Sequence, residues 1–304
     1  MTRNSTHPPS TTLSRERTSV TFWGVRGSLA APGEATRRIG GNTSCVELRS
    51  GATSLIFDAG TGLRACGEAL VREPARDLHL LLSHLHWDHI QGFPFFVLAY
   101  VPGTQLVVHG PCAQDTLRET LETQMRAPNF PVRFADLRSH VELRGTQAGV
   151  TQHLGDFAVR AALLNHPGGV FAYRIESSDA VVVYSTDHEH GSAADERLVE
   201  LAKGADVLIY DAMYTPEEYR GEAGPSRVGW GHSTFEEAAR VATAAGVRQL
   251  VLFHHDPSRT DDQVDALVSR ARALFPSTIA AREGLRLLPG AGDQSEAVLH
   301  ARVA

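Results

Sequence analysis

Short apolar runs and longer stretches with a helical period alternate along most of the chain. Apolar runs bounded by polar or glycine-rich segments predict strands, whereas apolar positions spaced three and four residues apart predict helices. The first half opens with adjacent strands and then alternates between strand and helix. Its predicted strands cover residues 20–25, 45–48, 54–57, 78–82 and 106–109, and its predicted helices cover residues 63–72 and 113–125.

The second half repeats this mixture of strands and helices. Adjacent strands combined with strand-helix alternation indicate two sheets covered by outer helices, an α/β fold of four layers known as an αβ/βα sandwich. The predicted strands of this half cover residues 158–164, 170–175, 180–184, 207–210 and 250–253, its helices cover residues 194–202, 234–245 and 261–275, and short strands follow near Thr278 and Leu285.

No linker divides this pattern, so we expect one domain over residues 19–290. Residues 1–18 are rich in Ser, Thr, Pro and Arg and have no apolar core, which predicts a flexible tail rather than a signal peptide or membrane anchor. Residues 291–304 are expected to form a C-terminal tail. No run of about eighteen apolar residues occurs, so the sequence predicts no membrane span.

The most distinctive segment follows directly after a predicted strand. Residues 83–89 read SHLHWDH and place three imidazoles and a carboxylate close together. His84 and His86 can project to the same side, while Asp88 and His89 turn back toward them. The alternative is a solvated polar loop. Because neutral imidazole and carboxylate are preferred zinc ligands, the segment predicts a catalytic or dinuclear metal centre rather than a tetrahedral structural site.

Composition limits which ligands the chain is expected to bind and in which redox compartment it is expected to work. The chain of 304 residues has a formal net charge of −6, which argues against a broad basic surface for long nucleic acid but leaves room for a small phosphate-bearing ligand. Its three cysteines, Cys45, Cys66 and Cys112, are scattered without a C-x-x-C pair. This favours thiols of a reducing cytoplasm over a disulfide framework, and metal ligands drawn from His and Asp.

Three more candidate ligands lie farther along the chain, each just after a predicted strand. They are His166, Asp187 and His254. Carboxyl ends of strands line the functional crevice of open α/β sheets, so these side chains can converge on residues 83–89. Taken singly, each could instead be a surface or helix-capping residue.

This ordered set resembles the metallo-β-lactamase superfamily, whose pattern is H-x-H-x-D-H followed by a distant His, an Asp and a final His. The resemblance runs from about Thr21 to about Leu288 and implies two metal ions, zinc or manganese. Asp58 resembles the family's structural Asp, which orients the metal loop. His255 is an alternative to His254, which is preferred because it directly follows the strand. The implied ligands are His84, His86 and His166 for one ion, Asp88, His89 and His254 for the other, and Asp187 as the bridge.

Two further segments indicate the type of reaction. Residues 231–234 (GHST) resemble the H-S-T motif of the ribonuclease Z-like phosphodiesterase branch, and residues 211–214 (DAMY) stand where that branch has H-E-A-T, with Asp in place of Glu. A carboxylate that orients a histidine makes a general acid for an alkoxide leaving group, which assigns Asp211 and His232 to catalysis. Ser233 and Thr234 could bind phosphate at the helix start, or simply cap the helix.

The resemblance leads to a mechanistic hypothesis. Hydroxide held between the two ions attacks phosphorus in line, and His232, oriented by Asp211, protonates the departing oxygen. Asp88 counts as both ligand and catalytic residue. His188 and His190 are expected in the surroundings of the site or at its rim.

The choice of substrate is narrowed because the chain lacks a segment that ribonuclease Z enzymes have. Ribonuclease Z enzymes carry a long tRNA-gripping arm between the positions of His166 and Asp187, where this chain has only twenty residues. The chain therefore resembles stand-alone members that open 3′,5′-cyclic nucleotides. Residues 92–100 either cover the pocket or form a buried helix and turn. A homodimer is expected, with residues 125–134 as an exchanged loop.

Other classes stay open at this point. A lactonase or thioesterase, a tRNA 3′-processing nuclease, a non-hydrolytic metal-binding sensor and an iron oxidoreductase can all be built on the same ligand pattern. They differ in substrate and in metal, which the sequence does not specify.

Overall fold

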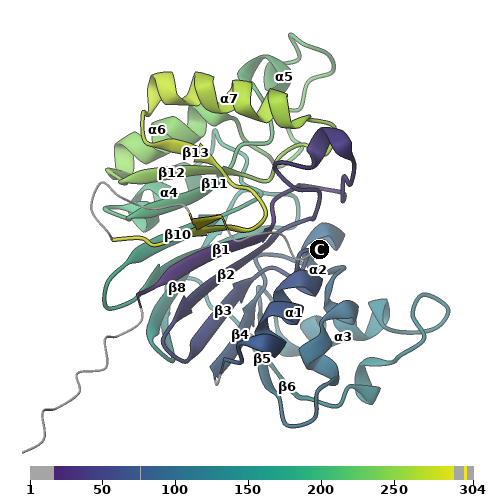
Figure 1. Cartoon of the computed structure of the whole chain (residues 1–304). Helices are drawn as coiled ribbons and strands as arrows, with labels where there is room; N and C mark the ends of the chain where they lie inside the picture. The colour runs from purple at the N-terminus through teal and green to yellow at the C-terminus, as the bar shows by residue number, and fades with distance from the viewer. Residues whose placement is uncertain (1–16, 76, 291–297, 300–304) are drawn as a thin grey trace, which may run out of the picture.

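Two mixed β-sheets pack face to face, and helices cover the outer face of each sheet (Figure 1). The computed structural model describes residues 17–75, 77–290 and 298–299. Four layers result, which confirms the predicted αβ/βα sandwich. Most of the two predicted tails lies outside the described residues. Thr18, placed in the predicted N-terminal tail, is buried, and its hydroxyl donates a hydrogen bond to Asp179 (2.6 Å), so the folded part includes it.

The first sheet has eight strands among the described residues. Its strands are antiparallel from β15 to β3 and parallel from β3 to β6. In spatial order they are β15 (Val298–Leu299), β14 (Leu285–Leu287), β1 (Ser19–Gly24), β2 (Cys45–Ser50), β3 (Thr53–Phe57), β4 (Asp77–Leu81), β5 (Gln105–Gly110) and β6 (His140–Gly145).

The second sheet has seven strands in the described part of the chain. Its strands are parallel from β13 to β10 and antiparallel from β10 to β7. In spatial order they are β13 (Thr278–Ala280), β12 (Gln249–Phe253), β11 (Val207–Asp211), β10 (Val181–Ser185), β9 (Val170–Glu176), β8 (Phe157–Leu164) and β7 (Thr151–Leu154).

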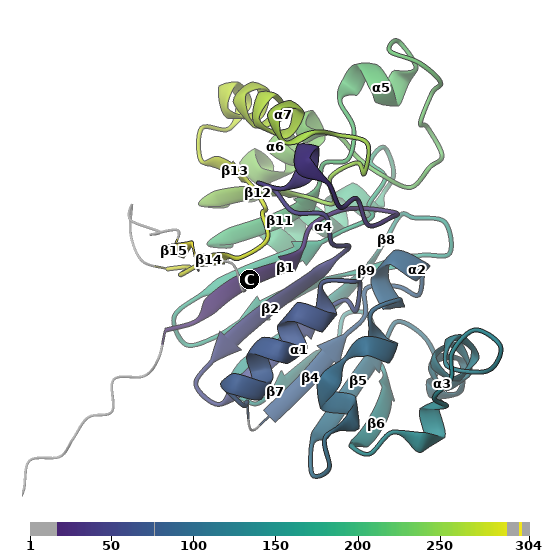
Figure 2. The same cartoon turned by 45° about the vertical axis from the view of Figure 1, so that its right-hand side comes forward.

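Helices α1 and α3 lie on the outer face of the first sheet, and helices α4, α6 and α7 cover the second sheet (Figure 2). Longer helices begin and end at recognisable signals. Thr234 caps the start of α6, Gly246 ends that helix with φ 63°, and a capping box at Thr260 starts α7. The helices are α1 (Leu63–Arg72), α2 (Trp87–Ile90), α3 (Gln114–Gln124), α4 (Ala194–Ala202), α5 (Pro216–Arg220), α6 (Phe235–Ala245) and α7 (Asp261–Leu274), with 3₁₀ turns η1 (Glu34–Thr36), η2 (Phe93–Phe95), η3 (Val97–Tyr100) and η4 (Phe134–Asp136).

Apolar side chains between the sheets hold the two halves together. Phe57 of the first sheet packs against Tyr173 and Tyr184 of the second, with ring centroids 5.4 and 5.5 Å apart. All three rings are buried. Close packing of this kind fixes the sheets relative to each other, and with them the loops at the strand ends.

Several segments differ from the sequence-based expectation. Strands β6 and β7 were not predicted, because their half-exposed positions give only weak apolar alternation. Strand β15 was not predicted either: it lies within the expected C-terminal tail and pairs with β14. Residues 92–100, for which a pocket cover or a buried helix and turn were expected, form the two 3₁₀ turns η2 and η3. Phe93 and Phe96 are buried, whereas Phe95 is exposed and packs edge-on against Phe130, with ring centroids 5.4 Å apart. The expected homodimer and loop exchange stay predictions.

The described helices include none that is long and apolar enough to cross a bilayer. Cys45, Cys66 and Cys112 form no disulfide; the first two are buried and the third is half-buried.

Candidate metal centre

The candidate site forms where strands of both sheets end. At these ends the backbone leaves the sheet, so the next side chain can turn toward the seam between the sheets. The sequence-predicted residues meet there because their strands run in the same direction toward one edge. Asp58 follows β3, residues 83–89 follow β4, His166 follows β8, Asp187 follows β10, Asp211 ends β11 and His254 follows β12.

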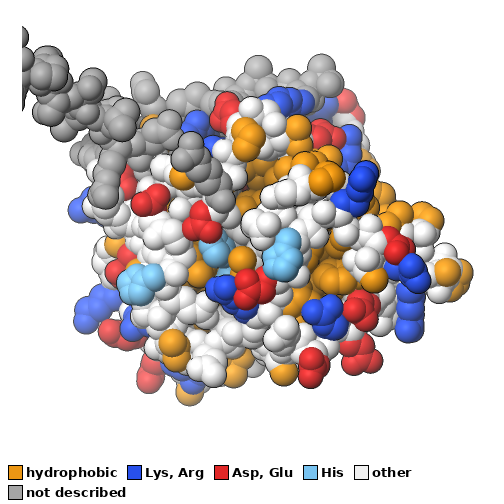
Figure 3. All heavy atoms as spheres, turned by 90° about the horizontal axis from the view of Figure 1, so that it is seen from below, with side chains coloured by type: hydrophobic (Ala, Val, Ile, Leu, Met, Phe, Trp, Pro, Cys, Tyr) orange, Lys and Arg blue, Asp and Glu red, His pale blue; other side chains and the backbone are white. Residues whose placement is uncertain are grey.

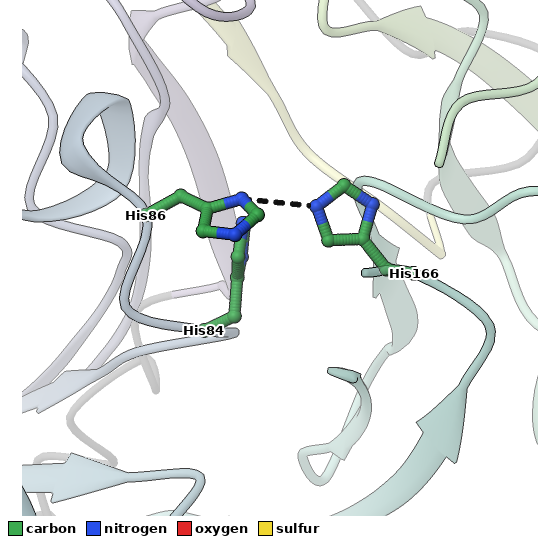
Figure 4. Close-up of side chains that lie close together, drawn as sticks. All are labelled: His84, His86 and His166. Atoms are coloured by element: carbon green, nitrogen blue, oxygen red, sulfur yellow. Dashed lines mark hydrogen bonds between the residues drawn. The ribbon is translucent and has the colours of Figure 1, made fainter. Parts of the chain in front are cut away.

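One cluster consists of three histidines, His84, His86 and His166 (Figure 4). Nδ1 of His86 faces Nε2 of His166 at 3.0 Å, and the ring of His84 lies 4.4 Å from that of His86. Nδ1 of His166 donates to the carbonyl of Gly231 (2.8 Å), which leaves the lone pair of its Nε2 directed into the cluster. His86 is exposed, so the cluster opens to solvent on this side.

A second cluster joins two carboxylates and two imidazoles: Asp88, His89, Asp187 and His254. Nε2 of His89 lies 3.1 Å from Oδ2 of Asp88 and 3.2 Å from Oδ1 of Asp187. Nε2 of His254 lies 3.2 Å from the same Asp187 atom. The other carboxylate oxygen of Asp187 lies 3.7 Å from Nε2 of His84, so Asp187 reaches both clusters.

The donor atoms fit two divalent cations. Nε2 of His84 and Nε2 of His89 are buried and have no hydrogen-bond partner among the described residues, which is costly unless another group satisfies them. Burial lowers the pKa of His84 and of His166, which keeps both imidazoles neutral, the form that binds metal. Ligand atoms of each cluster lie within 4.8 Å of one another. The buried clusters are consistent with a dinuclear site, and imidazole with carboxylate suits zinc.

Asp58 holds the metal loop in position, as the sequence predicted from its resemblance. Its carboxylate is fully buried and accepts hydrogen bonds from the backbone N–H of Ser83 (2.7 Å), the hydroxyl of Tyr184 (2.7 Å) and Nδ1 of His89 (2.8 Å). The last bond places the ring proton of His89 on Nδ1 and directs Nε2 toward the second cluster.

Left-handed backbone conformations gather at this site. Among the described non-glycine residues, positive φ occurs at Ser28 (57°), Asp58 (61°), Asp187 (50°) and His254 (57°). Ser28, which the sequence analysis missed, donates its backbone N–H to Asp88 (2.7 Å). Such strain is kept where surrounding contacts enforce it, which is typical of functional sites.

Asp211 and His232 form a hydrogen-bonded pair beside the second cluster. Oδ2 of Asp211 lies 2.9 Å from Nδ1 of His232, and that nitrogen lies 3.8 Å from Oδ2 of Asp187. Burial lowers the pKa of His232, but the Asp211 carboxylate, with Asp187 and Asp88, outweighs this and raises the pKa to about 9. The shorter Asp arm therefore still reaches its histidine.

The two hydroxyls proposed for substrate binding have partners within the protein. Ser233 is fully buried, and its hydroxyl lies 3.1 Å from the hydroxyl of Tyr210 and 3.0 Å from Nδ1 of His190. Thr234 is buried and accepts from the backbone N–H of Glu237 (3.3 Å) as the cap of α6. Capping and packing give both hydroxyls a partner within the protein, and their predicted role in substrate binding stays a prediction.

Three other histidines lie next to the site without joining either cluster. Nε2 of His188 contacts Asp195 at 2.9 Å, and the ring of His190 packs on Tyr219 at 4.4 Å. His255 points away, and its Nε2 donates to the carbonyl of Ala281 (3.0 Å). His254, rather than His255, faces the ligand atoms, in agreement with the sequence-based preference.

Glu189 connects the loop after β10, which carries Asp187, to the segment that carries His232, and the sequence gives no indication of this role. Its buried carboxylate accepts from the backbone N–H groups of Gly229 (2.6 Å) and Gly231 (2.8 Å) and from the hydroxyl of Tyr219 (2.9 Å). Because the carbonyl of Gly231 in turn orients His166, Glu189 supports a ligand through the backbone. In the sequence, Glu189 is only a glutamate two residues after the predicted ligand Asp187, and nothing in the pattern indicates this supporting role.

Replacing Glu189 with alanine is expected to weaken metal binding by about 10- to 100-fold, the range found when supports of metal ligands are removed. Calorimetric zinc titration measures this loss, and amide hydrogen exchange should become faster over residues 221–231. The control is Glu196→Ala, an exposed site on α4. Unchanged zinc affinity together with unchanged exchange would contradict the role of Glu189.

Comparisons with known proteins agree with this fold. The family model described as "Beta-lactamase superfamily domain" matches residues 53–255, about two thirds of the chain. The chain is 28% identical over 332 aligned positions to the Ribonuclease Z of Synechococcus sp. (strain CC9311), covering 88% of this chain and 98% of that protein.

Solved structures show the same fold at lower identity. The metallo-beta-lactamase fold protein YhfI from Bacillus subtilis superposes with a TM-score of 0.67 at 23% identity, covering 89% of this chain and 99% of that one. The short form of human tRNase Z superposes with a TM-score of 0.62 at 20% identity, again over 89% and 99%. Family match, fold and buried His/Asp clusters lead to one conclusion: the chain belongs to the metallo-β-lactamase superfamily.

Proposed function

We propose that this protein is a two-metal phosphodiesterase that hydrolyses small phosphodiesters. The observation that carries the proposal is the Asp211–His232 pair beside the ligand clusters (2.9 Å). A histidine oriented by a carboxylate can give a proton to an alkoxide, which a phosphodiester releases and which needs such help. Relatives named Ribonuclease Z at about 28% identity support phosphodiester chemistry.

The side chains of the site divide the work. When bound, two divalent ions supply a nucleophile at neutral pH and neutralise charge on the phosphate oxygens. His84, His86 and His166 would hold one ion, and Asp88, His89 and His254 would hold the other. Asp187 would contribute to both, because its carboxylate also lies near Nε2 of His84 (3.7 Å). His232 holds the proton for the leaving oxygen, and Asp211 fixes its ring because it accepts from Nδ1.

Features of the chain favour a small substrate over tRNA. Between His166 and Asp187 the chain forms only strands β9 and β10, an antiparallel pair joined by a short turn. The net charge is −6, and the face shown in Figure 3 carries acidic and basic side chains interspersed. Neither feature suits a long polyanion. The first substrate to test is a 3′,5′-cyclic nucleotide.

A substrate panel tests the proposal. Purified protein loaded with Zn²⁺ or Mn²⁺ is assayed with 3′,5′-cyclic AMP, 3′,5′-cyclic GMP, a linear dinucleotide and an acyl lactone. We expect hydrolysis of a phosphodiester and an intact lactone. An opened lactone with every phosphodiester intact would instead assign the site to the lactonase class.

A further inference from the structure

The segment between α5 and α6 carries a cation that has no acidic partner. Arg227 is half-buried, and its guanidinium makes no hydrogen bond or ion pair with any residue that the structure describes. Neighbouring arginines differ: Arg220 pairs with Glu222 at 2.7 Å, and Arg259 pairs with Glu218 at 2.7 Å. An arginine left without an acidic partner in a chain whose formal net charge is −6 is available for an anionic ligand.

Aromatic rings hold this guanidinium in place. Its central carbon lies 4.4 Å from the centre of the Trp230 ring and 5.9 Å from that of Tyr214. Stacking on ring faces leaves the N–H groups at the edge of the guanidinium free, and these form the planar fork that binds phosphate or carboxylate. The rings therefore orient the cation without using its hydrogen-bond donors.

The stacked arginine is linked to the candidate metal centre through Tyr214 and through the backbone that follows it. The ring of Tyr214 is 5.9 Å from the ring of His232. Trp230 directly precedes Gly231, whose carbonyl accepts from His166. Glu189 fixes the same segment through Gly231 (2.8 Å), so the arginine is carried by backbone tied to the ligands.

We infer that Arg227, stacked on Trp230, binds a second anionic group of the substrate. This inference rests on the proposed function and narrows it: preferred substrates are small phosphodiesters that carry a further phosphate or carboxylate. The scissile phosphate occupies the metal centre, and the second anion takes the fork of Arg227. A substrate without that group loses this contact and binds more weakly.

A matched pair of esters tests the inference. Thymidine 5′-(p-nitrophenyl phosphate) and its 3′-phosphorylated derivative differ only in the second phosphate. We expect wild-type protein to favour the derivative by about 10- to 100-fold in kcat/KM, the effect of one or two charged hydrogen bonds, mainly through KM. Arg227→Ala should remove this preference and leave the simple ester unaffected. Arg227→Lys, which keeps the charge without the fork, should retain part of it.

The control is Arg220→Ala, which removes a paired arginine at the end of α5, seven residues before Arg227, and should change neither ester. Equal losses on both esters in Arg227→Ala would show a merely structural role and overturn the inference, as would no loss on either. Hydrolysis of neither ester by wild-type protein would refute the proposed function instead. The inference is then decided by equilibrium binding of thymidine 3′,5′-bisphosphate against thymidine 5′-monophosphate: tighter bisphosphate binding that Arg227→Ala abolishes supports it, and equal binding overturns it.

Discussion

Replacing Asp187 with asparagine is expected to lower phosphodiester hydrolysis by about a thousand-fold or more and to reduce bound metal below two ions per chain. Asp187 reaches both clusters, with Oδ1 3.2 Å from Nε2 of His89 and Oδ2 3.7 Å from Nε2 of His84. The neutral amide of asparagine is a poor metal ligand. Metal ions stabilise the transition state by several kcal/mol, and each 1.4 kcal/mol corresponds to about tenfold in rate, so loss of an ion should cost about a thousand-fold or more.

Asparagine is the informative substitution because it tolerates the left-handed backbone of this position, φ 50°. Metal analysis and initial rates on the same sample measure both effects. The matched control is Asp195→Asn, which removes a carboxylate that pairs with His188 at 2.9 Å but lies outside the clusters. An Asp187→Asn protein that retains two ions and near wild-type rates would rule out the bridging position.

Replacing His232 with alanine is expected to have an effect that depends on the leaving group. For a phosphodiester with an alkoxide leaving group, the loss of a general acid should cost about 10²- to 10⁴-fold in kcat. Bis-p-nitrophenyl phosphate releases a phenolate that needs no proton, so its rate should fall far less. Asp211→Asn should follow the same pattern with a smaller loss, because Asp211 only orients the ring of His232 (2.9 Å).

The measurement is the ratio of two hydrolysis rates in each variant: that of the phosphodiester with an alkoxide leaving group and that of bis-p-nitrophenyl phosphate. A purely structural loss lowers both rates together, whereas loss of the acid changes the ratio. His190→Ala is the control, since His190 contacts Ser233 on the same segment but belongs to neither cluster. An unchanged ratio in His232→Ala would refute the general-acid role.

The sequence was most informative where metal-binding residue types directly follow a predicted strand. Residues 83–89 follow a strand that apolar pattern alone predicts, and the structure brings His84, His86, Asp88 and His89 toward one seam. The candidate ligands farther along the chain, His166, Asp187 and His254, lie at the same seam. Their strands end there because the alternation of strands and helices determines the topology of the two sheets.

Features fixed by tertiary contacts were not predictable in the same way. Glu189 and Ser28 act through backbone groups of loops, and a loop path leaves no period in the sequence. The motif predicts a substrate role for Ser233, whereas its contacts with Tyr210 and His190 are set by tertiary packing and leave no signal in the sequence. The sequence gives no sign of a role for Arg227, because its stacking on Trp230 and its lack of an acidic partner among the described residues arise only in the folded chain.

Metal-dependent turnover of one defined substrate tests the central claim most directly. Metal-free protein is titrated with Zn²⁺ in steps, and hydrolysis of bis-p-nitrophenyl phosphate is measured at each step together with bound zinc. We predict that activity rises until two zinc ions are bound per chain and then reaches a plateau. Two bound ions without phosphodiester hydrolysis in either the zinc or the manganese form would contradict the account.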